Sequence, residues 1–217
     1  MSFSLDMTMM YVMHDALRRE LERIARIIDR AGDDPRQILR TAAGWEMFKK
    51  YLRAHHAAED ETLWPVMAEL LTGREADLAL LDAMEAEHAV IDPILAAIDT
   101  TLADREARPE RLGSLVDYLR SALTAHLEHE ENQSLALIDD VLSQEQWSRV
   151  GQRQHELQGA EEVRRYLPWM LDDLAPERSA AILAALPEPI RQAYAAEWRP
   201  AYIELGLWTP TRHDHAA

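Results

Sequence analysis

The chain has 217 residues, a formal net charge of −16, no cysteine and only seven glycines. This length suffices for one substantial core plus an extension, and without cysteine any bound metal would need nitrogen and oxygen ligands. The acidic balance argues against nucleic-acid partners and anionic membrane surfaces, since both are bound through lysine and arginine. We find no basic signal segment and no run of 18 apolar residues, so we expect a cytoplasmic protein without a membrane partner.

Apolar residues recur at alternating spacings of three and four in four stretches, which predicts four long amphipathic helices. The stretches span residues 7–28, 36–71, 81–102 and 110–141. Asp34 and Pro35 should start the second helix. Short connections between long helices favour antiparallel neighbours, so we predict an all-α fold with an up-down-up-down four-helix bundle. Pro65 and Pro93 should each bend or interrupt their helix.

The composition changes in the last third of the chain. Six of the ten prolines follow residue 160. They predict several short helices, which contain Trp169, Trp198 and Trp208. We therefore expect a bundle domain over residues 1–143 and a short-helix C-terminal extension over residues 144–217, packed on the bundle because it has too few apolar residues for a core of its own.

Six polar residues occupy positions within the apolar stripes. They are His14 in the first stretch, His55 and Glu59 in the second, His88 in the third, and His126 and Glu130 in the fourth. At a rise of about 1.5 Å per residue, antiparallel helices place these groups at one level of the bundle to within one turn. His56 and Asp60 instead share the phase of Lys49 and Arg53, which predicts a solvent flank.

The six buried groups need an explanation for their polarity. A lone histidine on an apolar face is usually a core residue with satisfied hydrogen bonds, but here four share one layer with two carboxylates. Burying each group without a partner would cost about 1–3 kcal/mol. A metal-free network of imidazoles and carboxylates could offset that cost. A cation held by neutral imidazoles and bridging carboxylates accounts for all six at once.

Four motifs, one on each predicted helix, carry a family resemblance: "HDALRRE", "HHAAEDETLWP", "EHAVIDPIL" and "HLEHEE". In this order and spacing the chain resembles the hemerythrin family, in its bacterial HHE cation-binding branch, over roughly residues 6–142. The resemblance implies a four-helix bundle that holds a non-haem di-iron centre. The segments "YLPWML" and "EWRP" are similar to extensions of actinobacterial members.

The resemblance also implies a ligand set. By position, the family's ligands match His14, His55, Glu59, His88, His126 and Glu130. The two glutamates would bridge two iron ions, which also share an oxo or hydroxo bridge. Oxygen-carrying hemerythrins have a further histidine where this chain has Met84, and a thioether is a poor ligand for ferric iron. His56 is the candidate replacement, the alternative being an exposed histidine beside a buried one.

Other polar residues near the motifs are weaker candidates. Glu131 could be a ligand if the last turn slides, and His129 is expected at the rim of the site. Tyr11 and Tyr51 could donate hydrogen bonds to ligands, although core packing is the simpler interpretation. Asp92 could orient the histidine of the third helix or cap a kink at the following proline.

Two main interpretations of function remain open. The first is a di-iron protein whose open position suits peroxide chemistry, with catalase- or peroxidase-like turnover, or binds dioxygen or nitric oxide. The alternative is an iron sensor, an iron store or an oxygen-binding module without turnover. A bundle that holds zinc or manganese, or no metal, is a third possibility. The expected partners are small ligands (dioxygen, peroxide or nitric oxide), and the sequence does not indicate whether there is a protein partner.

Overall fold

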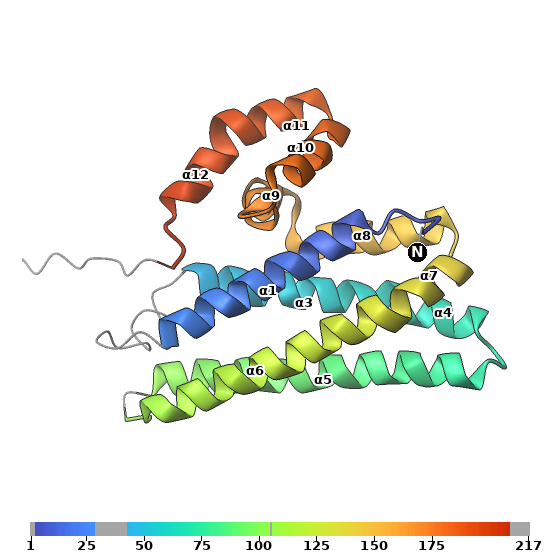
Figure 1. Cartoon of the computed structure of the whole chain (residues 1–217), viewed down its shortest axis with the longest axis horizontal. Coiled ribbons are helices and arrows are strands. Elements are labelled where there is room, and N and C mark those ends of the chain that lie inside the picture. Colours follow the sequence, from blue (N-terminus) through green and yellow to red (C-terminus); the bar gives the residue numbers. More distant parts are fainter. Residues whose placement is uncertain (1–2, 29–42, 105, 209–217) are drawn as a thin grey trace, which may run out of the picture.

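The computed structural model describes residues 3–28, 43–104 and 106–208, and their regular secondary structure is entirely helical. Four long helical segments form a bundle. They are α1 (Thr8–Ile28), α3 (Ala43–Thr62) continued by α4 (Trp64–Leu70), α5 (Glu75–Ala103), and α6 (Pro109–His129) continued by η1 (Glu130–Ser134) and α7 (Leu135–Val141). Successive segments run antiparallel (Figure 1). The predicted all-α up-down-up-down bundle is therefore confirmed. The expected helix start at Asp34 and Pro35 lies outside the described residues.

The two prolines predicted to disturb the bundle have different effects. Pro65 stands in the first turn of α4, and Leu63 separates α3 from α4, so the helix is interrupted there. In contrast, α5 continues through Pro93 without interruption. Pro93 is exposed. The backbone hydrogen bond that proline cannot donate is therefore missing on the solvent-facing side of the helix, and the packed side holds the helix together.

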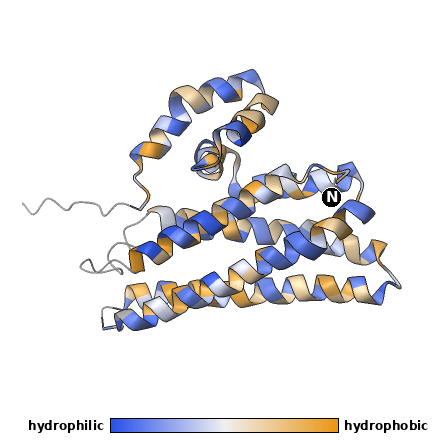
Figure 2. Cartoon of the chain, viewed as in Figure 1, coloured by the Kyte–Doolittle hydropathy of each residue, from blue (hydrophilic) through white to orange (hydrophobic). Residues whose placement is uncertain are grey.

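Buried apolar side chains form two clusters that lie on either side of the histidine level. On α5, for example, Leu81 and Met84 belong to one cluster, whereas Ile91 and Leu95, after His88, belong to the other. Figure 2 shows that hydrophobic and hydrophilic residues are interspersed along the helices of the bundle. Each large side chain buried in this way stabilises the fold by about 1.5–3 kcal/mol. The polar layer is thus enclosed by hydrophobic core at both ends.

The C-terminal extension consists of short helices. They are α8 (Gln144–Gln158), η2 (Ala160–Glu162), α9 (Val163–Leu171), α10 (Pro176–Ala185), α11 (Glu188–Ala193), η3 (Tyr194–Trp198) and α12 (Arg199–Glu204). A capping box between Ser143 and Gln146 starts α8, which packs along α3. Leu167 and Trp169 of α9 belong to the same cluster as Tyr51 of the bundle. The division of the chain at residue 143 stays a prediction.

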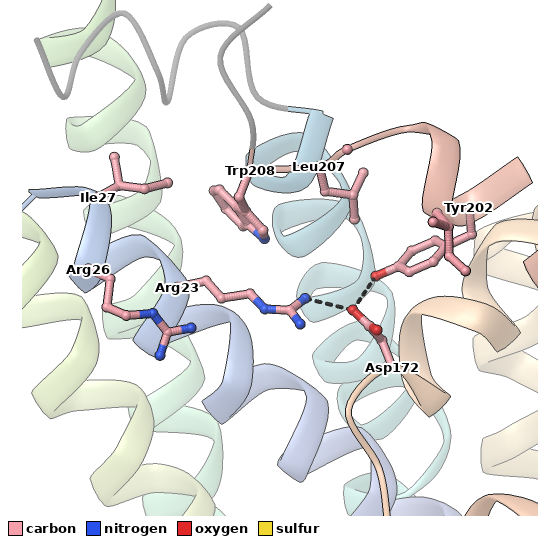
Figure 3. A pocket seen from close by; sticks show the side chains of 9 residues that line it. Arg23, Arg26, Ile27, Asp172, Tyr202, Leu207 and Trp208 are labelled. Carbon is pink, nitrogen blue, oxygen red and sulfur yellow. Dashed lines mark hydrogen bonds and ion pairs between the residues drawn. The ribbon is translucent and has the colours of Figure 1, made fainter. Parts of the chain in front are cut away.

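Polar contacts also join the extension to α1. Arg23 donates from Nη1 to Oδ2 of Asp172 at 2.8 Å, and the Tyr202 hydroxyl donates to the same oxygen at 3.0 Å (Figure 3). The fully buried Glu20 accepts a hydrogen bond from Trp208 Nε1 at 2.6 Å. Arg23, Asp172, Tyr202 and Trp208 line a pocket of about 380 Å³ whose described lining contains no histidine. We assign this region to the attachment of the extension.

Gly44 at the start of α3 permits part of this attachment. A Cβ atom at this position would lie 2.5 Å from the ring of Trp208. A larger residue would therefore push the indole away from the bundle. Within the described residues, no helix is both long enough and apolar enough to cross a lipid bilayer.

Candidate metal centre

Six buried side chains gather in the middle of the bundle as two groups of potential metal ligands. One group contains His56, His88 and His126, and the other contains His14, His55 and Glu130. Within each group, one potential ligand atom of each residue lies within 4.8 Å of the others. The Nε2 atoms of His88 and His126 are 3.1 Å apart, and those of His14 and His55 are 3.2 Å apart. Nitrogens from different helices therefore converge on two points.

Glu59 lies between the two groups. Its side chain is fully buried, with Oε1 at 3.4 Å from Nδ1 of His55 and Oε2 at 3.6 Å from Nε2 of His88. Glu130 is equally buried and lies 3.2 Å from Nε2 of His14, although this contact lacks hydrogen-bond alignment. None of the four carboxylate oxygens makes a hydrogen bond within the described chain. Buried carboxylates without donors are costly, so a cation fits the site.

His56 belongs to this layer, and its predicted position on a solvent flank is wrong. Only 7% of the residue is exposed, and its Nε2 has no hydrogen-bond partner among the described residues. Its ring stacks on that of His88, with centroids 3.9 Å apart. The reason is that α3 packs against α1, α5 and α8, which bury a wider arc than one apolar stripe. Asp60, predicted on the same flank, is exposed.

In three of the histidines, the ring nitrogen that faces away from the centre contacts a carboxylate outside the ligand groups. The pairs are His14 Nδ1 with Glu131 Oε1 at 2.8 Å, His88 Nδ1 with Asp60 Oδ1 at 2.7 Å, and His126 Nδ1 with Glu87 Oε2 at 3.0 Å. An acceptor on Nδ1 keeps the proton there and leaves the Nε2 lone pair facing the centre, as in many metal-binding histidines. The pairs that Asp60 and Glu87 form were not predicted from the sequence. The position of Glu87 directly before His88 was the available signal.

The weaker candidates have other roles. Glu131 lies outside both ligand groups, and it also accepts a hydrogen bond from Arg18 at 2.8 Å. His129 is partly buried at the rim, with Nδ1 at 2.8 Å from Glu87. Of the two roles considered for Asp92, the structure does not support the orientation of His88, because Asp92 pairs with Arg53 across an exposed surface and Asp60 contacts His88.

The tyrosines and Met84 contribute packing. The Tyr51 hydroxyl donates to Oε1 of Glu162 at 2.8 Å, and Tyr11 packs against the cluster that contains Leu63 and Met84. Met84 is fully buried in that cluster. It therefore fills apolar space in the core.

Burial sets the protonation of the imidazoles. It lowers the pKa of His55 and His56 well below the usual value, and neighbouring imidazoles lower it further. Burial also lowers the pKa of His126. For His14 the same effect is outweighed by Glu130 and Glu131, which raise its pKa. Most of the layer is therefore neutral at pH 7, the form in which imidazole binds metals.

The pKa values of the two buried carboxylates in the layer shift in opposite directions. Burial, together with Glu130, raises the pKa of Glu59 well above the usual value. Burial would also raise the pKa of Glu130, but the contact with His14 outweighs it and lowers the pKa to about 2. The layer thus favours one carboxylate and one carboxylic acid until a cation supplies positive charge.

A π-helical segment, η1 (Glu130–Ser134), directly follows α6 at the centre. Such segments are rare and often occur at functional sites. Here the segment begins at Glu130, which lies in the ligand layer, and Glu131 accepts from the outer nitrogen of His14. Consecutive carboxylates thereby approach the same histidine. The helical periodicity of the sequence did not predict this segment.

The fold and the buried layer together define a four-helix bundle built to bind a cation. The sequence model of the hemerythrin HHE cation binding domain matches residues 6–138, and the chain belongs to this family. Among curated proteins, the chain is similar to the zinc finger protein BRUTUS-like of Arabidopsis thaliana, with 21% identity over 210 residues. The match covers 88% of this chain but only 17% of that relative. No solved structure matched significantly. The bacterial branch and the actinobacterial type of extension stay predictions.

Proposed function

We propose that the chain is a non-haem di-iron protein whose centre reacts with peroxide or binds dioxygen or nitric oxide. The observation that carries this proposal is the position of Glu59. This buried carboxylate has one oxygen near His55 in one ligand group and the other near His88 in the second group. A carboxylate with two otherwise unpaired oxygens in that position suits a bridge between two cations.

The ligand assignment follows from the two groups. We assign His56, His88 and His126 to one ion and His14, His55 and Glu130 to the other, with Glu59 shared. His56 then supplies the imidazole that Met84 does not. Five imidazole nitrogens and four carboxylate oxygens are fewer than the roughly twelve positions of two octahedral ions. Positions are therefore left for water or an exchangeable small ligand.

Iron bound here would supply Lewis acidity and one-electron redox chemistry. The residues of the chain provide the rest. Neutral imidazoles offer lone pairs, and the outer carboxylates fix the ring orientations. The apolar clusters on both sides exclude bulk water from the layer. A hollow of about 210 Å³ between α3 and α5 reaches His56 and His88, which is enough room for a molecule the size of peroxide.

The first experiment is metal analysis of protein purified from iron-replete cells, with an ultraviolet–visible spectrum. We expect about two irons per chain, an absorption band in the near ultraviolet that azide perturbs, and oxygen release when hydrogen peroxide is added. Reversible oxygen uptake without peroxide consumption would favour the oxygen-binding alternative. One zinc per chain and no such band would refute the di-iron proposal.

A further inference from the structure

The hollow of about 210 Å³ between α3 and α5 connects the protein surface with the candidate metal centre. Its lining includes exposed residues of both helices and the assigned ligands His56 and His88. An ion that binds in the buried layer has to pass between helices to reach it. A second cavity, between α1 and α8, meets the same layer at His55. The walls of the two cavities decide which of them suits a cation.

The charges in the lining of the hollow favour a cation. Asp60, Glu85 and Asp92 contribute three carboxylates, and Arg53 contributes the one guanidinium in the described lining. Nε of Arg53 donates to Oδ1 of Asp92 at 2.9 Å, so these two charges cancel. The exposed carboxylates of Asp60 and Glu85 keep their charge without a lysine or arginine partner in that lining. A cleft lined by one sign of charge raises the local concentration of ions of the opposite sign.

His56 joins the hollow to the buried layer. The residue is 7% exposed, and its Nε2 is enclosed without a hydrogen-bond partner among the described residues. Its Nδ1 also lacks such a partner but is not among the enclosed atoms, so this nitrogen faces the hollow. In His14, His88 and His126 the Nδ1 atom contacts a carboxylate instead. The ring of His56 therefore has one unpaired nitrogen at the hollow and one in the layer, and imidazole nitrogen is a good ligand for divalent transition metals.

The cavity between α1 and α8 has different walls. Its lining contains three methionines, the indole of Trp147 and several neutral polar side chains, and Asp6 supplies the one carboxylate in its described part. Thioethers and an indole replace the water shell of a divalent cation poorly, whereas carboxylates and imidazoles replace it well. The hollow between α3 and α5 is thus the better path for an ion.

We propose that divalent cations enter and leave the metal centre through the hollow between α3 and α5. The carboxylates of Asp60 and Glu85 attract the ion, and His56 is the first imidazole that it meets. This inference rests on the proposed metal centre and adds the path by which its ions exchange. It gives Glu85, which is not one of the assigned ligands, a role in the rate of metal binding.

Uptake of Co²⁺ by the full-length protein, freed of metal with a chelator and followed by stopped-flow absorption, tests the path. Ala89 on α5 is exposed and lines the hollow, whereas Ala86, about one turn earlier, is exposed and outside the described lining. Ala89→Trp should slow uptake about 10-fold or more, because the ion then has to wait for the indole to move. Ala86→Trp should take up cobalt at the wild-type rate. Circular dichroism checks the helix content, and Ala89→Leu serves if Ala89→Trp does not fold.

A charge reversal at Glu85 tests the attraction of the ion. Glu85→Lys should slow cobalt uptake roughly 3- to 10-fold at low ionic strength. The difference from the wild type should shrink as added salt screens the charge. Glu22→Lys, at an exposed position of α1 outside the described lining, changes the net charge equally and should keep the wild-type rate. All four variants should bind the same number of cobalt ions at equilibrium.

The outcomes separate this inference from the di-iron proposal. Slower uptake in Ala89→Trp or in Glu85→Lys than in its control supports the path, whichever metal the isolated protein carries. Equal rates within both pairs, in proteins that still bind cobalt, would overturn the path and leave the metal centre intact. A protein that binds neither cobalt nor iron would refute the metal centre and the path together. Cobalt uptake through the hollow in a protein isolated without iron would contradict only the assignment of iron.

Discussion

Oδ1 of Asp60 lies 2.7 Å from Nδ1 of His88, while Nε2 of the same ring lies 3.1 Å from Nε2 of His126. An exposed carboxylate, with 42% of its side chain accessible, thus holds a ring that is 95% buried. Because the carboxylate can only accept, the proton of neutral His88 is on Nδ1, and the lone pair of Nε2 faces the centre. Asp60 at the surface thus determines which ring nitrogen of the buried His88 is free to bind a metal.

Asp60→Ala is therefore expected to weaken iron binding without abolishing it. Loss of such an outer partner typically costs 10- to 100-fold in metal affinity. Competition with a chelator of known affinity measures the change. Asp92→Ala is the matched control, because Asp92 pairs with Arg53 and not with His88. Equal affinities for the two variants would contradict the role assigned to Asp60.

Glu59→Ala and Glu130→Ala should each lose most of the bound iron. Both carboxylates are fully buried in the ligand layer, and each is assigned as a ligand. The iron content of the purified variants measures the effect. Glu61→Ala is the control, since Glu61 pairs with Arg153 at the surface. Full iron content in Glu59→Ala would show that the assigned bridge is wrong.

His56→Ala should reduce the iron content to about one ion per chain. His56 belongs to only one of the two ligand groups, so the other group keeps its complete set. His129→Ala, which changes a rim residue on the neighbouring helix, should retain both ions. Two irons in the His56→Ala protein would instead support a ligand set with one imidazole fewer.

Glu162 gives the stability of the chain a predictable pH dependence. Burial would raise its pKa, but hydrogen bonds from Lys50 at 2.6 Å and from Tyr51 at 2.8 Å outweigh burial and lower it. Because the pKa of Glu162 is lower in the folded state than in the unfolded state, the ionised side chain stabilises the fold at any pH above its unfolded-state pKa. That contribution is lost as the pH falls through the folded value.

Glu162→Gln should therefore reduce the free energy of unfolding by about 1–2 kcal/mol at pH 7. The difference from the wild type should shrink as the pH falls through the lowered pKa of Glu162, where the wild-type side chain becomes protonated. Urea unfolding at several pH values measures it. The exposed neighbour provides the control, as Glu161→Gln should change little at any pH. If the difference in unfolding free energy between Glu162→Gln and the wild type grew as the pH fell, the assigned direction of the Glu162 pKa shift would be wrong.

Truncation after Ser143 should destabilise the bundle while leaving every assigned ligand in the chain. The rings of Tyr51 and Trp169 lie 4.8 Å apart within one hydrophobic cluster. Removing Trp169 alone by substitution with alanine should cost about 3–5 kcal/mol, and the truncation should cost more. Denaturant unfolding and solubility report on both variants. A soluble truncated protein of unchanged stability would indicate an extension that is separable from the bundle.

The helices could be predicted because each bundle segment carries an apolar stripe of helical period. Periodicity does not report a π turn, however, because that depends on local backbone energetics around Glu130. Beyond η1 the buried positions include Ile138 and Leu142, whereas Val141, at the end of the predicted apolar stretch, is only partly buried. The number of helices and their direction were therefore accessible from sequence, and this local change of phase was not.

The candidate site was predictable to the extent that its members interrupt apolar stripes. His14, His88 and His126 lie in the buried layer as their positions indicated. The misplacement of His56 has a different origin. Its burial depends on neighbours of α3 that are distant in sequence, and a single helical period contains no information about them. The same holds for the Asp60–His88 contact, which joins two helices.

The attachment of the extension also has a consequence for the order of events during synthesis. Arg19 on α1 donates hydrogen bonds to the backbone carbonyls of Trp169 and Asp172, each at 2.6 Å. The two contacts join residues that are separated by 150 and 153 positions in the sequence. At about 5–20 residues per second, a ribosome needs roughly 8–30 s to make the intervening chain. The helix that carries His14 is thus made about 150 residues before the carbonyls that Arg19 binds, so we expect this contact to form only after the bundle helices have been synthesised.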